Sequence, residues 1–220
     1  MNYSLKVPQP VFLIFFSFFC FFAVYSQEDV LVEEVDLADQ IQNPVANIVT
    51  IPIQNNLDFN DVNKYTMNIQ PVLPFGITED VNLILRHIIP VISGPDLSSP
   101  FGGKTSGIGN ISAAMLFTPA KPGKLIWGVG PTITYGSITP GLGSEKFSLA
   151  PSALVLYQNN GWTIGMLAQN SWSVAGPSDA PDVNLFYSQI FVTKNLANGW
   201  YVNSAPIITA NWEAPSGSQW

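Results

Sequence analysis

The stretch 161–173, GWTIGMLAQNSWS, decides the fold class of this chain. Alternate side chains of an extended strand share a face, and one face here carries Trp162, Ile164, Met166, Ala168 and Trp172. The ten residues from one tryptophan to the other give a rise of roughly 25 Å, at about 3.3 Å per residue and a tilt of about 40°. That rise matches the lipid-facing band of a membrane barrel, whose two water interfaces favour amphipathic rings. The stretch therefore predicts a strand that crosses a bilayer.

Two other stretches repeat this arrangement of aromatic side chains. In 65–75, one face carries Tyr65, Met67, Ile69, Pro71, Leu73 and Phe75, and the other carries Thr66, Asn68 and Gln70. In 199–213, Trp200 and Trp212 share a face with Val202, Pro206 and Ile208. We therefore predict an aromatic girdle that consists of Tyr65, Phe75, Trp162, Trp172, Trp200 and Trp212.

Strand-like runs follow one another from Ala46 to the C-terminus. We count nine, at 46–56, 64–75, 80–92, 107–117, 124–135, 147–157, 161–173, 182–194 and 199–213. After the first connection (57–63), short connections (76–80, 118–123, 158–161, 195–199) alternate with longer ones (93–106, 136–146, 174–181). Short periplasmic turns and longer external loops are typical of an outer-membrane barrel. The predicted fold is all-β, an antiparallel transmembrane β-barrel of about nine strands over residues 46–220.

Five prolines fall inside these runs and conflict with regular pairing. Pro71, Pro90, Pro131, Pro151 and Pro206 each lack the N–H group that a ladder needs. We expect bulges or local bends at these positions. Asn170 is a second irregularity, because strict alternation turns it toward lipid.

The composition favours a lipid-facing surface over a water-facing one. Only 10% of the 220 residues are charged, against about 25% in typical soluble domains. The net charge is −7, and six acids (Glu28, Asp29, Glu33, Glu34, Asp36 and Asp39) lie close together without a base. The remainder is nearly neutral, which excludes a basic nucleic-acid-binding face.

The N-terminus has the features of an export signal. Lys6 precedes an apolar run of fourteen residues, 11–24, which is too short for a membrane-spanning helix. We predict a signal peptide at 1–26 that is cleaved before Gln27, so that removal of Cys20 leaves the mature chain without a thiol. The acidic lead-in, 27–45, is predicted to contain a short amphipathic helix over 28–42. Two placements remain open for that helix, on the periplasmic side in water or inside the barrel mouth.

Catalytic and metal-binding patterns are weak. His87 is the only histidine, and alternation points it toward lipid, while no Gly-x-Ser-x-Gly motif accompanies it. Asp179 and Asp182 flank Pro181 and could bind a divalent ion weakly, but a solvated loop explains them better. We predict no enzyme activity, no cofactor and no metal site.

Polar residues collect on the face of each strand that would point inward. The main predicted lumen-lining set is Asn68, Gln70, Asn82, Arg86, Gln169, Asn211 and Glu213, and a wider set adds Thr66, Lys124, Thr132, Thr134, Thr163, Ser171 and Asn203. Such residues either line an aqueous path or fill the interior by bonding to one another. The inward glycines Gly128, Gly130 and Gly165 favour a cavity.

Several segments resemble a bacterial family of outer-membrane transporters linked to the meta-pathway of phenol degradation, some of which carry the misleading label neuromedin U. The segments that carry the resemblance are 42–47 (QNPVAN), 52–56 (PIQNN), 68–74 (NIQPVLP), 118–131 (TPAKPGKLIWGVGP), 181–184 (PDVN) and 206–214 (PIITANWEA). The resemblance covers residues from about 41 to the end. It implies a barrel with a transport role, and it supplies no substrate or site residues.

Relatives of that family continue with further strands beyond the position of Trp220. An even strand number is usual in single-chain bacterial barrels, so we expect an odd number of C-terminal strands, about three, to be missing here. Three functions remain open: a passive, porin-like channel or transporter for small molecules, aromatic or hydrophobic ones among them; a structural or lipid-binding barrel with a plugged lumen; and a secreted soluble β-sandwich. The expected location is the outer membrane of a Gram-negative-type cell, and the expected partners are its lipid, the barrel-assembly machinery and a small solute.

Overall fold

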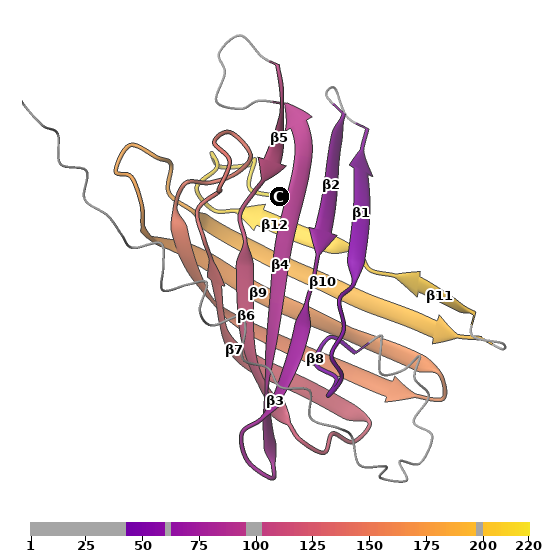
Figure 1. Cartoon of the computed structure of the whole chain (residues 1–220). Helices are drawn as coiled ribbons and strands as arrows, with labels where there is room; N and C mark the ends of the chain where they lie inside the picture. The colour runs from indigo at the N-terminus through magenta and orange to yellow at the C-terminus, as the bar shows by residue number, and fades with distance from the viewer. Residues whose placement is uncertain (1–42, 60–62, 96–102, 197–199) are drawn as a thin grey trace, which may run out of the picture. The chain divides into compact units, whose positions relative to one another are not determined.

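The computed structural model describes residues 43–59, 63–95, 103–196 and 200–220. Within these ranges the chain forms twelve antiparallel strands and no helix. The strands make one continuous curled sheet, a half-barrel with nine strand positions, instead of the two stacked sheets of a sandwich (Figure 1). The predicted all-β antiparallel fold is confirmed. The signal peptide and the helix predicted over 28–42 lie outside the described residues.

The strands are named in chain order. They are β1 (Ile53–Asp58), β2 (Lys64–Ile69), β3 (Val72–Gly76), β4 (Val81–Pro95), β5 (Lys104–Ile108), β6 (Ser112–Pro119), β7 (Leu125–Thr134), β8 (Phe147–Asn159), β9 (Trp162–Ala175), β10 (Asn184–Asn195), β11 (Tyr201–Ser204) and β12 (Ile207–Asn211). The order across the sheet is β1-β2-β4-β6-β7-β8-β9-β10-β11. β3 also pairs with β4, β5 with β4, and β12 with β10.

Three predicted runs are each divided into two strands. The run 64–75 becomes β2 and β3, 107–117 becomes β5 and β6, and 199–213 becomes β11 and β12. Pro71 and Pro206 lie in two of the breaks because they cannot donate to the ladder. The first run, predicted at 46–56, is displaced, since pairing begins only at Thr50 and β1 extends to Asp58.

Of the two irregularities expected at the prolines, bulges or local bends, a bulge is present beside Pro90, whereas the register is unshifted at the other four prolines. The register of β4 with β2 and β3 is the same on both sides of Pro71, with Ile69 opposite Ile89 and Val72 opposite Arg86. Pro206 likewise leaves the pairing of β10 with β11 and β12 unshifted. Register is a property of the whole strand, so a single missing N–H group does not have to change it.

Pro131 and Pro151 face each other across an unbroken β7–β8 register. The β6–β7 pairing has no partners between Ala114 and Phe117, and β8–β9 has none between Leu149 and Ser152. The two prolines therefore leave the ladder that they share intact and remove pairing on its outer sides.

A one-residue bulge lies opposite Pro90, on the neighbouring chain segment. Ile88 pairs with Ser112 and Val91 pairs with Ile108, so the segment between β5 and β6 holds one extra residue. The N–H group of Gly109 donates to the Pro90 carbonyl at 3.0 Å within this segment. A second register shift lies at Phe147 and Ser148.

The connections make the two ends of the sheet different. The strand ends Gly76 and Val81, Pro119 and Leu125, Asn159 and Trp162, and Asn195 and Tyr201 lie at one end of the sheet, here called the short-turn end. The strand ends Asp58 and Lys64, Pro95 and Lys104, Thr134 and Phe147, and Ala175 and Asn184 lie at the other, the long-loop end. The tightest turn is formed by Asn160 and Gly161, with φ of 50° and 71°. Positive φ at both central residues is the requirement of a type I′ hairpin turn.

Burial alternates strictly along the central strand β8. On β8, Leu149, Pro151, Ala153, Val155 and Tyr157 are exposed, whereas the even-numbered residues between 148 and 156 are buried. We call the exposed side the outer face and the other side the inner face. Side chains from both edges of the sheet, β1 and β12, and from strands between them line one common pocket on the inner face, which makes that face the concave one.

Candidate functional site

A pocket of about 430 Å³ lies on the inner face. Its polar side chains include Gln54, Asn68, Gln70, Arg86, Gln169 and Gln189, and its apolar ones include Ile88, Leu116, Leu167 and Ile207. These residues come from strands at both edges and at the centre of the sheet, because its curl turns their inward side chains toward one another.

A hydrogen-bonded row of side chains forms one wall of this inner pocket. Gln70 Nε2 donates to Gln54 Oε1 at 3.0 Å, and Arg86 Nη2 donates to Gln70 Oε1 at 2.6 Å. Arg86 is partly buried, in the first half of β4. Across the described ranges, the single ion pair joins Lys146 and Asp182, so Arg86 has no carboxylate partner there.

The opposite wall is neutral and also hydrogen-bonded. Thr132 and Ser152 share a buried hydrogen bond of 2.7 Å between their hydroxyls, and Ser152 Oγ donates to Gln169 Oε1 at 3.1 Å. The Tyr187 hydroxyl donates to Gln189 Oε1 at 3.1 Å. The pocket therefore combines one cation, Arg86, and one exposed carboxylate, Asp58, with several amides and hydroxyls, which suits orientation of a polar group on a ligand.

The inner face is apolar toward the short-turn end. Val72, Ile84, Leu116, Ile126, Leu154, Leu156 and Leu167 form a buried cluster with Val45. Asn43 and Ala46, which flank this valine in the lead-in, are also buried, and the Asn43 side chain accepts the N–H of Val45 at 3.0 Å. The simple expectation of a polar interior thus describes only part of the face, because inward leucine and isoleucine side chains pack against the lead-in.

The predicted lumen-lining residues divide into two groups. Asn68, Gln70, Arg86 and Gln169 line the inner pocket together, as do Thr66 and Thr132 of the wider set. Asn82 is buried on β4 outside the pocket, while Asn211 and Glu213 are exposed at the long-loop end. Of the remaining wider set, Thr163 and Ser171 are buried, Thr134 is partly buried, and Lys124 and Asn203 are exposed.

Sequence reasoning missed several pocket residues. Tyr187 and Gln189 lie on β10, which is apolar on both faces for part of its length and so gives a weak alternation signal. Gln54 and Asn56 belong to β1, the strand whose position was displaced. Tyr187 and Gln189 are two residues apart and so share one face of β10. This spacing of two polar side chains is the sequence signal that could have identified them as inward-facing.

The predicted aromatic positions lie at both ends of the outer face. Trp162 and Trp200 are exposed at the short-turn end, where Phe75 is partly buried, and Trp172 and Trp212 are exposed at the long-loop end, where Tyr65 is partly buried. Lys194 Nζ lies 5.0 Å from the centre of the Trp162 ring, a cation–π contact. Aliphatic side chains occupy the space between these two ends on β7, β8 and β9.

Asn170, the amide that alternation turns toward lipid, has two side-chain partners. Its Oδ1 accepts the indole N–H of Trp212 at 2.8 Å, and its Nδ2 donates to Asn184 at 3.0 Å. The Trp212 ring also packs edge-on against Trp220 at 5.4 Å. A paired amide beside the tryptophans costs far less in an apolar setting than an unpaired one.

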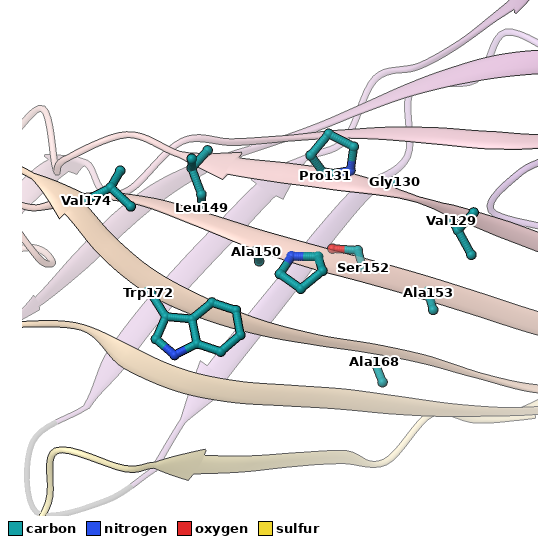
Figure 2. A pocket seen from close by; sticks show the side chains of 11 residues that line it. Val129, Gly130, Pro131, Leu149, Ala150, Ser152, Ala153, Ala168, Trp172 and Val174 are labelled. Carbon is teal, nitrogen blue, oxygen red and sulfur yellow. The ribbon is translucent and has the colours of Figure 1, made fainter.

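The outer face holds a shallow groove of about 610 Å³, drawn in Figure 2. Pro131, Leu149, Ala153, Ala168 and Trp172, labelled in Figure 2, are among the residues that line it. Apart from Ser152, whose hydroxyl bonds to inner-face residues, the lining is apolar. The groove can accommodate hydrocarbon but has no group that would orient a polar substrate.

Polar contacts organise the long-loop end. Lys146 Nζ lies 3.3 Å from Asp182 Oδ1, with 11% of the lysine side chain and 71% of the aspartate side chain exposed. The hydrogen bond from Lys146 holds the pKa of Asp182 below its usual value, and a bond from Ser173 and the lysine charge act in the same direction. The Asp182 carboxylate therefore forms an ion pair with Lys146, whereas from the sequence it was considered together with Asp179 as a possible ligand of a divalent ion.

The described ranges contain no group of three or more metal-ligating side chains and no helix long and apolar enough to cross a membrane. His87 is partly buried on β4 opposite Ala113. No protein-family model, curated protein or solved structure matches this chain.

Proposed function

We propose that this chain is a β-barrel protein of the outer membrane of a Gram-negative-type cell. We propose further that it provides small molecules, aromatic or hydrophobic ones among them, with a passive route across that membrane. The observation that supports this proposal is the outer face, where exposed apolar side chains fill the space between aromatic side chains at both ends.

The outer face is difficult to reconcile with water. Val129, Val155, Ile164 and Met166 are each 43–46% exposed on adjacent strands. A contiguous apolar patch of this kind marks contact with another apolar phase. Hydrocarbon is favoured over a protein partner because the tryptophans occupy the two ends of the face, where two membrane–water interfaces would lie.

The edges of the sheet set a condition on this proposal. Among the described residues, β1 pairs only with β2, and β11 and β12 pair only with β10 (Figure 1). Unpaired N–H and C=O groups are not tolerated in hydrocarbon. The membrane form therefore requires strands on both edges, from the same polypeptide or from another.

The inner pocket supports the transport part of the proposal. Its polar row lies beside apolar side chains, an arrangement that suits a small molecule with both kinds of surface. A plugged, structural barrel is the second candidate, and the buried contact of Val45 with the inner apolar cluster favours it. In that case the lead-in closes the short-turn end.

Two experiments test the proposal in sequence. The full-length chain should fractionate with outer membranes and migrate faster on gels before boiling than after, as folded barrels do. A chain that is water-soluble without detergent would refute the membrane assignment. In the second experiment, proteoliposomes should take up small aromatic solutes, and Val45→Asp should increase that uptake if the lead-in restricts it. Absence of uptake with both proteins would support the plugged barrel.

A further inference from the structure

We propose that the inner pocket binds a small organic carboxylate with an apolar body, and that Arg86 is its charged anchor. This inference deepens the proposed function by naming the chemical class of the solute, and it depends on that function only for the statement that the solute is transported. Binding itself is a property of the pocket and can be measured without a membrane.

Charge is the first argument for an anion. Arg86 points into the inner pocket from a partly buried position, and Gln70 is its hydrogen-bond partner among the described residues. A guanidinium group is always charged, and a buried charge is normally paired. The side chains that line the pocket with it are amides, hydroxyls and apolar groups, except for Asp58, which is exposed on β1 near the long-loop end.

The geometry of the row favours a carboxylate in particular. Gln70 accepts from Nη2 of Arg86 and is itself fixed by Gln54, so the row holds the guanidinium in one orientation. An oriented guanidinium forms two parallel hydrogen bonds with a carboxylate. The pocket contains a single cation, which matches one negative charge better than the greater charge of a phosphate ester.

The remaining surface of the inner pocket suits the rest of such a molecule. Ile88, Leu116, Leu167 and Ile207 provide apolar contacts. Gln169 uses its oxygen to accept from Ser152, which orients its amide toward the pocket. A volume of about 430 Å³ lies in the lower part of the range of small-molecule sites, so one small molecule fills it.

The carboxylate could also come from the chain itself. The acidic lead-in carries Glu28, Asp29, Glu33, Glu34, Asp36 and Asp39, and it continues into Val45, which is buried on the inner face. The chemistry at Arg86 is the same for either source. A variant in which all six acids are replaced by the corresponding amides separates the two.

The experiment is a titration of the folded, detergent-solubilised full chain with benzoate, followed by calorimetry, with neutral benzamide as the matched probe. We expect benzoate to bind at least ten-fold more tightly than benzamide. Arg86→Gln should remove this preference, and Arg86→Lys should weaken benzoate binding while keeping the preference. Lys104→Gln is the charge-matched control, because Lys104 is exposed at the start of β5 and does not line the pocket, and it should bind as wild type does.

Three results would overturn the proposal. The first is equal binding of benzoate and benzamide by wild type. The second is benzoate binding that survives Arg86→Gln in a variant with unchanged heat-modifiable migration. The third is binding that appears only in the six-amide variant, which would assign the site to the acidic lead-in. Membrane fractionation tests the proposed function independently of benzoate binding. The carboxylate-binding proposal can therefore fail while the membrane assignment holds, and the reverse.

Discussion

Replacement of Met166 by lysine distinguishes a lipid-facing outer face from a water-facing one. Met166 lies on β9 with 44% of its surface exposed, between Val155 of β8 and Ile190 of β10. Trp162 and Trp172 lie on the same face at the two ends of its strand. A lysine at this position would place an ammonium group where the proposed hydrocarbon is thickest.

The magnitude follows from the position along the strand. Met166 is four residues from Trp162, a rise of about 10 Å along a band of roughly 25 Å, so it lies within about 3 Å of the midplane. Lysine at the midplane of a barrel costs about 2–4 kcal/mol. On a water-exposed surface, the same substitution changes the free energy of unfolding by about 0.5 kcal/mol or less in either direction. The two expectations do not overlap.

The assay is equilibrium unfolding by urea of the full-length chain folded into phospholipid vesicles. Val174→Lys is the matched control, since Val174 is 55% exposed on the same strand, two residues beyond Trp172. Near the interface the cost should be about 0–1 kcal/mol. If Met166→Lys and Val174→Lys destabilise the protein equally and by less than about 1 kcal/mol, the outer face does not contact hydrocarbon and the membrane assignment fails.

Three shorter predictions test the fold around the site. Gly130→Ala should lower the free energy of unfolding by about 1–3 kcal/mol, because its Cβ would overlap the Met115 carbonyl, whereas Gly123→Ala meets no atom within 4 Å and should be nearly neutral in the same urea titration. Asn110→Ala removes three hydrogen bonds of 2.7–2.9 Å to the connection 135–146, so limited proteolysis should cut that connection faster, and an unchanged rate would contradict this role. The pKa of Asp182 is held low by Lys146, so their ion pair is fully formed above the usual carboxyl pKa and is lost as pH falls through the lowered one; NMR titration should show a higher Asp182 pKa in Lys146→Met.

The segments that were predicted well have two unlike faces. β9 matches its predicted run closely, because Trp162, Met166 and Trp172 alternate with smaller or more polar side chains. The bounds of β8 could be recognised because this strand lies between a loop and a glycine-containing turn. Where alternation is clear, the requirement that one face be buried leaves a single register.

The segments that were predicted poorly lack this contrast. The first strand was predicted to begin at residue 46, yet the ladder begins only at Thr50, because pairing with β3 depends on where the lead-in leaves the inner face. The polar wall formed by Tyr187 and Gln189 was hidden by the apolar composition of β10. Contacts between neighbouring strands, such as Gln54 with Gln70 and Gln70 with Arg86, depend on which strands pair and in which register, which the composition of a single strand does not encode.

The facing prolines of β7 and β8 have a consequence for assembly. Pro131 and Pro151 are opposite each other, and their missing donors fall on the far sides of the hairpin. A slip of one residue between the two strands would turn the outward residues of one strand inward, and it would also bring that strand's proline to a position where the shared ladder needs a donor. The observed alignment therefore keeps both prolines out of the shared ladder, whereas a one-residue slip does not. The facing prolines thus disfavour a one-residue misalignment of this hairpin, in addition to the requirement that its outer face be apolar.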